Sequence, residues 1–253
     1  MVELNLSKEQ SLVQLDLRKQ EVENIVMGIP QLQNITSRVA LVLDFSGSMR
    51  SLYDNGTVQA IIERIMPIAM QFDDNQELDL WIFESGFKRL GGVTKDNFYG
   101  LAKKIRDNYR MGGTEYAPVM NDILAKYVKE EPAKLPNYVI FITDGDNSDH
   151  GNTNKIITEI SNYPIFFQFI GIGHDDFKYL QKLDDMSGRY VDNADFFAVS
   201  DINAMSDNDL YKKLFDEYPN WLSDNKVINM INSQGINTTN NKGGLFGGLF
   251  GRH

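Results

Sequence analysis

The chain has 253 residues, of which 42% are hydrophobic and 24% are charged, so its composition is that of an ordinary globular protein. The formal net charge is −10 at pH 7. A negatively charged protein repels the phosphate backbone of a nucleic acid, so we expect no nucleic-acid binding. The absence of cysteine excludes disulfides, thiolate metal sites and a cysteine nucleophile.

The amino terminus, MVELNLSKEQ, lacks the basic start and apolar core of a signal peptide. No apolar run approaches the roughly 20 residues that a transmembrane helix needs. We therefore expect a cytoplasmic protein with no transmembrane segment.

Apolar runs and amphipathic stretches alternate along the chain from residue 38 onward. RVALVLD and YVIFITD are continuously apolar until their last residue, as is typical of parallel strands covered on both faces. FKRLGGV is short and polar, and is predicted to pair with its predecessor in the antiparallel direction. The predicted strands lie at residues 38–44, 77–83, 87–93, 138–144, 164–173 and within 189–199. The predicted helices lie at residues 56–72, 97–109, 117–130, 153–163, 176–186 and 208–223.

Alternation of strands and helices predicts an α/β fold, with a doubly wound, mostly parallel six-stranded sheet. Right-handed crossovers then place helices on both faces of that sheet, in three layers. Pro67 lies inside the predicted helix 56–72 and is expected to kink or interrupt it.

The two ends of the chain differ from this pattern. Residues 1–35 are predicted to form an appendage packed on the core, with an extended start and one or two short helices. Ser7 and Gln10 have the spacing of a capping box there. The main domain is predicted at residues 36–225, and residues 226–253 are predicted to form a flexible tail rich in Asn and Gly.

The tail contains the repeat GLFGGLFG, which places Phe246 and Phe250 on a segment with little means of burying them. Two interpretations stay open. The segment is either a flexible end without a specific role, or a docking motif whose two phenylalanines bind another protein.

Oxygen-bearing side chains follow two of the predicted buried strands. Asp44 ends one strand and Asp144 ends another, so both carboxylates should emerge at the same edge of the sheet, where ligands bind in such folds. Ser46 and Ser48 lie in the turn after Asp44, and Gly47 lets the backbone turn tightly between them. The two hydroxyl groups can therefore converge on one point.

Thr114 follows two glycines in a loop that can approach the same edge, and Glu115 beside it is a candidate contact with a partner. The set of two carboxylates and three hydroxyls contains only oxygen donors, which Mg²⁺, Mn²⁺ and Ca²⁺ prefer. Such an ion remains electrophilic and can accept an Asp or Glu from another protein. Residues 146–149 are interpreted as a cap for the following helix rather than as further ligands.

These residues resemble the metal-ion-dependent adhesion site of von Willebrand factor A domains. The matching parts, in chain order, are Asp44-Phe45-Ser46-Gly47-Ser48, then Thr114, then Thr143-Asp144-Gly145. The resemblance covers about residues 38–223. It implies that Ser46, Ser48 and Thr114 contact the ion, and that Asp44 and Asp144 bind it directly or through water. Mg²⁺ is the expected ion, with Mn²⁺ or Ca²⁺ as alternatives.

The stretches MQFDDNQELDLWIF, GGTEYAPVM, FITDGDNSD and FFQFIGIG resemble the intracellular bacterial A domains that accompany tellurium-resistance and related stress-response operons. That resemblance implies a protein that is not an enzyme and that assembles cytoplasmic or membrane-associated complexes.

Two other functions stay open at this point. The ion site could serve only to stabilise a structural stress protein. A Mg²⁺-dependent phosphohydrolase of the haloacid dehalogenase type also places an Asp at the end of its first strand. That chemistry needs a second carboxylate two residues later, however, where this chain has Ser46.

Overall fold

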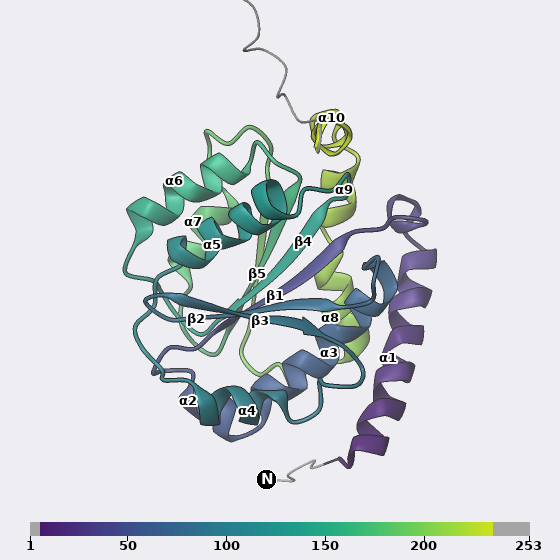
Figure 1. The fold of residues 1–253 in the computed structure, drawn as a ribbon, viewed down its shortest axis with the longest axis vertical. Coiled ribbons are helices and arrows are strands. Elements are labelled where there is room, and N and C mark those ends of the chain that lie inside the picture. The colour runs from purple at the N-terminus through teal and green to yellow at the C-terminus, as the bar shows by residue number, and fades with distance from the viewer. Residues whose placement is uncertain (1–5, 235–253) are drawn as a thin grey trace, which may run out of the picture.

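The computed structural model describes residues 6–234, which form a six-stranded sheet between two layers of helices (Figure 1). The strand order is β3-β2-β1-β4-β5-β6, and every neighbouring pair is parallel except β2 and β3. The predicted doubly wound α/β fold is therefore confirmed. The strands are β1 (Arg38–Asp44), β2 (Leu78–Phe83), β3 (Phe87–Val93), β4 (Asn137–Thr143), β5 (Ile165–Ile172) and β6 (Ala194–Val199).

The helices divide between the two faces of the sheet (Figure 1). One face is covered by α1 (Lys8–Met27), α2 (Arg50–Asp54), α3 (Thr57–Phe72), α4 (Leu101–Asn108), α8 (Asp207–Leu214), α9 (Tyr218–Leu222) and α10 (Asn225–Ser233). The other face is covered by α5 (Ala117–Leu124), the π-helix η2 (Ala125–Glu130), α6 (His150–Ile160) and α7 (Lys178–Asp184). A short 3-10 helix, η1 (Pro30–Leu32), joins α1 to the sheet.

The apolar runs form the central strands because their side chains are covered on both sides. Leu41 and Leu43 of β1 point into one core, whereas Ala40 and Val42 point into the other. Every residue of β4 and β5 is buried. Continuous apolar character in the sequence thus corresponds to strands between two helical layers.

The N-terminal segment forms one helix of 20 residues, α1, rather than the one or two short helices predicted. The capping box is confirmed, since Ser7 Oγ accepts from the Gln10 amide and the Gln10 side chain accepts from the Ser7 amide. Leu15 and Val22 are buried on one side of α1, which packs against α3 and α8. Burial of this apolar stripe over the whole segment stabilises a single helix.

Three further boundaries differ from the predictions. Helix α3 continues through the buried Pro67, so the predicted interruption is wrong. The predicted helix 208–223 is divided into α8 and α9, with Pro219 in the first turn of α9, where a proline is tolerated. Residues 225–233, which the predicted tail largely includes, form α10. Asp224 caps it, and Val227 is fully buried.

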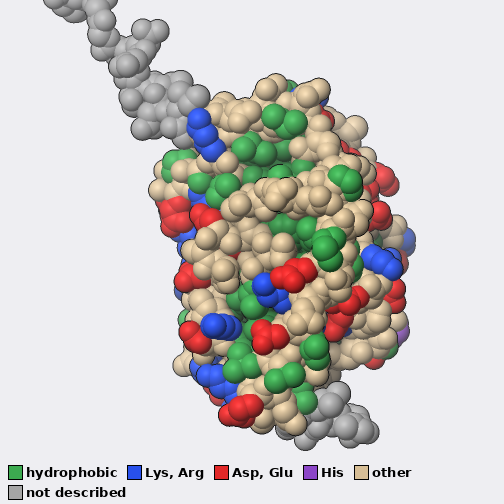
Figure 2. All heavy atoms as spheres, turned by 90° about the vertical axis from the view of Figure 1, so that its right-hand side faces the viewer, with side chains coloured by type: hydrophobic (Ala, Val, Ile, Leu, Met, Phe, Trp, Pro, Cys, Tyr) green, Lys and Arg blue, Asp and Glu red, His purple; other side chains and the backbone are tan. Residues whose placement is uncertain are grey.

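None of the helices within residues 6–234 combines the length and the apolar character needed to cross a membrane. On the face that carries α1, apolar side chains lie among charged side chains of both signs (Figure 2).

Candidate metal centre

The carboxyl ends of β1 and β4 bring the two predicted aspartates to the same place. The two strands are parallel neighbours, with Leu43 paired to Ile142. Asp44 is the last residue of β1, and Asp144 directly follows β4. Both side chains therefore belong to the sheet edge where ligands bind in doubly wound folds.

A continuous chain of polar contacts joins four of the predicted ligands. The Ser46 amide donates to Asp44 Oδ1 over 2.7 Å, and the hydroxyls of Ser46 and Ser48 lie 3.0 Å apart. Ser48 Oγ donates to Asp144 Oδ1 over 2.8 Å. Adjacent oxygen ligands of a Mg²⁺ ion are about 3 Å apart. The spacing of the hydroxyls and of Asp144 therefore fits one small divalent cation without large movement.

The carboxylates of this centre are held in a low-dielectric environment. Burial raises the pKa of Asp44 to about 6, although hydrogen bonds from Thr143 and Ser46 lower it and the charge of Asp144 raises it further. Burial also raises the pKa of Asp144, whereas the hydrogen bond from Ser48 lowers it. Within residues 6–234, neither carboxylate forms an ion pair with Lys, Arg or His. A bound cation would supply the missing positive charge.

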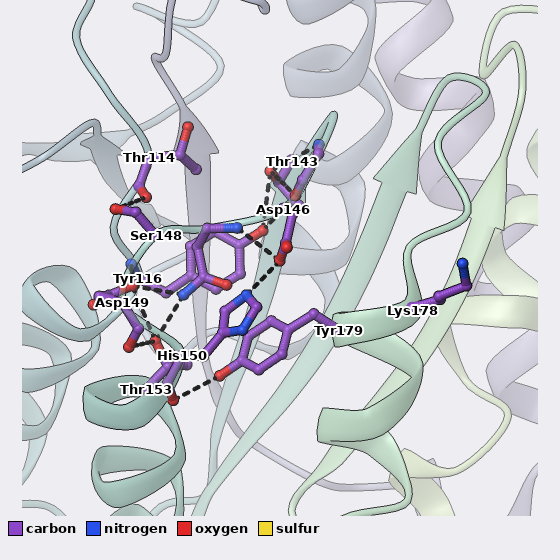
Figure 3. A network of polar contacts seen from close by, with 12 residues as sticks. Thr114, Tyr116, Thr143, Asp146, Ser148, Asp149, His150, Thr153, Lys178 and Tyr179 are labelled. Carbon is purple, nitrogen blue, oxygen red and sulfur yellow. Dashed lines mark hydrogen bonds and ion pairs between the residues drawn. The ribbon is translucent and has the colours of Figure 1, made fainter.

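The loop that carries Thr114 lies beside this centre, where hydrogen bonds of its main chain hold it. The Gly47 amide donates to the Gly112 carbonyl over 3.1 Å, and the Thr114 carbonyl accepts from the Ser148 amide over 2.9 Å. The Ser148 hydroxyl also donates to the Thr114 carbonyl, over 3.2 Å (Figure 3). In the described part of the chain, the Thr114 hydroxyl makes no hydrogen bond to the other four predicted ligands. Its role as a ligand therefore stays a prediction.

Two residues that the sequence analysis did not name as ligands support the centre from behind. Thr143 Oγ1 donates to Asp44 Oδ2 over 2.6 Å. The buried Tyr116 lies beside it and donates its hydroxyl to the Gly145 carbonyl over 2.7 Å (Figure 3). The one signal in the sequence for a role of Thr143 was its position directly before Asp144. Nothing in the sequence placed Tyr116 near Asp44.

Asp149 has a different role from the predicted one. It occupies the N-cap position of α6, but its side chain does not cap that helix. Its two carboxylate oxygens instead accept from the amides of Tyr116 and Ala117, each over 2.9 Å, at the start of α5 (Figure 3). Asp149 thus fixes the loop after Thr114 to the loop after Asp144.

Asp146 is directed to a histidine. Asp146 Oδ1 lies 2.7 Å from His150 Nε2, and the His150 ring stacks on Tyr179 with a centroid separation of 3.7 Å (Figure 3). This contact agrees with the interpretation that Asp146 has a structural role.

The predicted partner-binding residues are only partly described. Glu115 is half-buried, donates its amide to the Glu84 carbonyl, and lines a hollow between α5 and α6. Phe246 and Phe250 lie outside the described residues, so the proposed docking role of the tail stays a prediction.

We expect Gly112→Ala to weaken metal binding by moving the Thr114 loop away from Ser46. A Cβ atom at Gly112 would lie 2.5 Å from Glu84 Oε2 and 3.2 Å from Glu84 Cβ. The Glu84 carboxylate can rotate away, but the contact with Glu84 Cβ can be relieved only by a small shift of the Gly112 backbone, which is bridged to Ser46. The free energy of unfolding should fall by about 1 kcal/mol, a typical cost of a local clash.

Gly151→Ala is the matched control, because nothing lies within 4 Å of a Cβ atom there, and alanine favours the helix that contains this residue. Calorimetric Mg²⁺ titration and urea unfolding should therefore separate the two variants. Equal metal affinity in both would contradict a role for the Gly112 bridge.

Comparisons with known proteins agree with this geometry. A sequence profile of the vWA-TerF-like family, described as the vWA found in the TerF C terminus, matches residues 36–231. The chain is similar to the uncharacterized protein YcbR of Bacillus subtilis (strain 168), with 43% identity over 224 residues. The match covers 87% of this chain and 91% of that protein.

Several solved structures share the fold. A von Willebrand factor type A structure from Catenulispora acidiphila matches with a TM-score of 0.52 and 13% identity, over 74% of this chain and 43% of that one. The SpRpn10 VWA domain matches with a TM-score of 0.51 and 12% identity, over 71% of this chain and 95% of that one.

Proximal thread matrix protein 1 of the mussel byssus, with a zinc-occupied MIDAS motif, matches with a TM-score of 0.51 and 18% identity. The match covers 72% of this chain and 48% of that one, so this chain spans about half of the mussel protein. At such identities the likeness shows the fold alone. The sequence profile and the relative from Bacillus go further, and the chain belongs to the vWA-TerF-like family of von Willebrand factor A domains.

Proposed function

We propose that this chain is a metal-ion-dependent protein-interaction module that binds a partner's Asp or Glu through a divalent cation, with Mg²⁺ as the principal ion. Asp44, Ser46, Ser48, Asp144 and Thr114 are the proposed ligands. The observation that carries the proposal is the chain of contacts from Asp44 through Ser46 and Ser48 to Asp144. All of the side-chain atoms in these contacts that could bind a metal ion are oxygens, as hard divalent cations require.

The burial of these residues supports a site with one closed and one open side. Asp44 and Ser46 are buried, with exposed fractions of 0% and 2%, whereas Ser48 is exposed and Asp144 is half-buried. The buried end would anchor the ion, and the exposed end would leave a coordination position for an anionic oxygen of another protein. Thr143 and Tyr116 would hold the Asp44 carboxylate in place.

The wider biological setting is part of the same proposal. We propose that the protein is not an enzyme, acts in the cytoplasm, and takes part in a stress-response complex related to tellurium resistance. The TerF-related family description and the resemblance of the sequence to such A domains support this setting. vWA domains are in general interaction modules, and Ser46 stands where the phosphohydrolase alternative needs a carboxylate.

The first test is calorimetric titration of Mg²⁺, Mn²⁺ and Ca²⁺ into the chelator-treated full-length chain. We expect saturable binding that weakens about tenfold or more in Ser48→Ala, since even outer-shell changes cost metal sites that much. Ser148→Ala is the matched control, because its hydroxyl contacts only the Thr114 carbonyl in the described structure. No saturable binding up to tens of millimolar ion would overturn the proposal.

The second test concerns the partner. Wild-type and Ser48→Ala proteins are immobilised, and the proteins retained from a bacterial lysate are compared with Mg²⁺ and with a chelator. A protein retained only by the wild type and only with Mg²⁺ is the expected result. If the ion raises the melting temperature but changes no association, the ion site is purely structural.

A further inference from the structure

A second group of carboxylates lies at the other edge of the sheet. Asp184 ends α7, Asp195 is the second residue of β6, and Glu217 precedes α9. One carboxylate oxygen from each lies within 4.8 Å of the others. Helix α9 lies at the end of the sheet opposite α2, the helix that follows Ser48 (Figure 1). This second group is therefore separate from the candidate metal centre.

Arg189 only partly offsets the charge of the three carboxylates. Burial raises the pKa of Glu217 and Arg189 lowers it, whereas burial lowers the pKa of Arg189 and the charges of Asp184 and Glu217 raise it. In residues 6–234, none of them forms an ion pair with Lys, Arg or His. Arg189 is the nearby cation, but its guanidinium pairs with Asp192 over 2.6 Å and donates to the main-chain carbonyl of Met186 over 3.0 Å and to that of Asp184. Negative charge therefore accumulates between α7, β6 and α9.

A buried amide supplies a second, independent observation. Gln168 in β5 is paired with Asp195 in β6, so both side chains stand on the same face of the sheet, next to each other. Gln168 is fully buried, and within the described structure neither its Oε1 nor its Nε2 makes a hydrogen bond of normal geometry. A buried amide without partners costs free energy, and a cation bound to Oε1 would remove the part of this cost that comes from the oxygen.

Burial and mutual repulsion disfavour the ionised forms of these carboxylates. Burial, followed by the charge of Asp195, raises the pKa of both Asp184 and Glu217 to about 7. Burial also raises the pKa of Asp195, and a contact with the Gln168 side chain that falls short of a normal hydrogen bond partly offsets this rise. Asp185, Asp192 and Asp216 add further negative charge around the group.

We propose that Asp184, Asp195 and Glu217, together with Oε1 of Gln168, bind one Ca²⁺ ion at this edge of the sheet. All four donors are oxygens. Ca²⁺ takes several carboxylate and amide oxygens from a protein, whereas Mg²⁺ is usually held by one or two carboxylates and keeps several waters. Three carboxylates and one amide oxygen therefore suit Ca²⁺. Asp195 is only 8% exposed and Glu217 is exposed, so the ion can enter from the side of α9.

Such an ion would tie the last part of the chain to the sheet. Glu217 lies between α8 and α9, and α10 follows directly. Asp184 and Asp195 lie on elements that are part of the main fold. The bound ion would therefore fix the position of α9 against β6, at a site independent of the proposed function.

The test is calorimetric titration of Ca²⁺ into the chelator-treated full-length chain and into Asp44→Asn, Glu217→Gln and Asp216→Asn. We expect a class of Ca²⁺ sites that survives Asp44→Asn but is weakened about tenfold or more by Glu217→Gln. Asp216→Asn removes a neighbouring charge that is not among the three, so its affinity should change less than about threefold.

Melting temperatures guard against a variant that simply fails to fold. Without Ca²⁺, Glu217→Gln should melt at or above the wild-type temperature, because it relieves repulsion between carboxylates. In the Asp44→Asn background, which excludes binding at the candidate metal centre, Ca²⁺ should raise the melting temperature, and the added change Glu217→Gln should remove that gain. Ca²⁺ binding that Asp44→Asn removes and Glu217→Gln leaves unchanged would overturn this proposal and leave the candidate metal centre intact. Absence of binding to Asp44→Asn would also overturn it.

Discussion

Asp44→Asn is expected to abolish Mg²⁺ binding at the candidate metal centre and, without metal, to make the protein more stable at about pH 8. The affinity should fall by more than about 100-fold, because a direct anionic ligand is replaced by a neutral amide. The gain in stability has a separate cause. Asp44 is fully buried, and its ionised form is disfavoured by that burial.

The sign of this effect follows from the pKa of Asp44, which is about 6 in the folded protein and 3.8 for the ordinary side chain. Because the folded-state value is higher, ionisation favours unfolding as the pH rises from about 4 to about 6. Above that window the free energy of unfolding of the wild type is roughly 2–3 kcal/mol lower than it would be with a neutral side chain at this position. Asn avoids this loss, so the advantage of Asp44→Asn should appear across the same window and stay constant above it.

Urea unfolding of both proteins from about pH 4 to 8, with chelator and with saturating Mg²⁺, measures both effects. At 100 times its dissociation constant, the ion should stabilise the wild type by about 2.7 kcal/mol and leave the variant unchanged. Asp146→Asn is the control, because it also removes a negative charge, and the Asp146 carboxylate contacts His150. Its stability and its response to Mg²⁺ should match those of the wild type. A variant that is less stable than the wild type at every pH would contradict this account of Asp44.

Arg64→Ala is expected to lower the free energy of unfolding by about 3–5 kcal/mol, because it removes a buried guanidinium from one half-buried carboxylate and two main-chain carbonyls. Arg64 is only 4% exposed and its guanidinium contacts Asp207 as well as the carbonyls of Ile202 and Met205, the latter over 2.8 Å. Truncation leaves the Asp207 carboxylate with fewer hydrogen-bond donors and leaves the carbonyls of Ile202 and Met205 without the guanidinium donor.

The matched control is Arg106→Ala, because Arg106 pairs with Asp54 over 3.1 Å at a much more exposed position. That change should cost less than about 1 kcal/mol. The measurement is urea unfolding at neutral pH in the presence of chelator, so that metal binding does not contribute. Equal losses in the two variants would contradict the role of Arg64 as a buried anchor.

The sequence predicted the strands well because burial on both faces leaves a clear pattern. RVALVLD and YVIFITD became β1 and β4 with boundaries within one residue of those predicted. The helix boundaries were less accurate. The continuity of α3 through Pro67, for example, depends on packing with distant segments, which local propensity does not report.

The candidate metal centre was predictable where its residues follow strands. Asp44 and Asp144 meet because β1 and β4 are neighbours, and Ser46 and Ser48 follow within four residues. The supporting residues come from other parts of the chain. Asp149 accepts from the amides of Tyr116 and Ala117, which lie 33 and 32 positions away in sequence. Tyr116 donates to the Gly145 carbonyl, 29 positions away, and no local pattern indicates such contacts.

The contact between the first and eighth helices has a consequence for protein synthesis. Arg18 of α1 pairs with Asp207 at the start of α8, although 189 positions separate them in the sequence. At translation rates of about 5–20 residues per second, Asp207 is made roughly 10–40 s after Arg18. During that interval the emerging α1 cannot complete its packing, and its apolar stripe remains available to ribosome-associated chaperones.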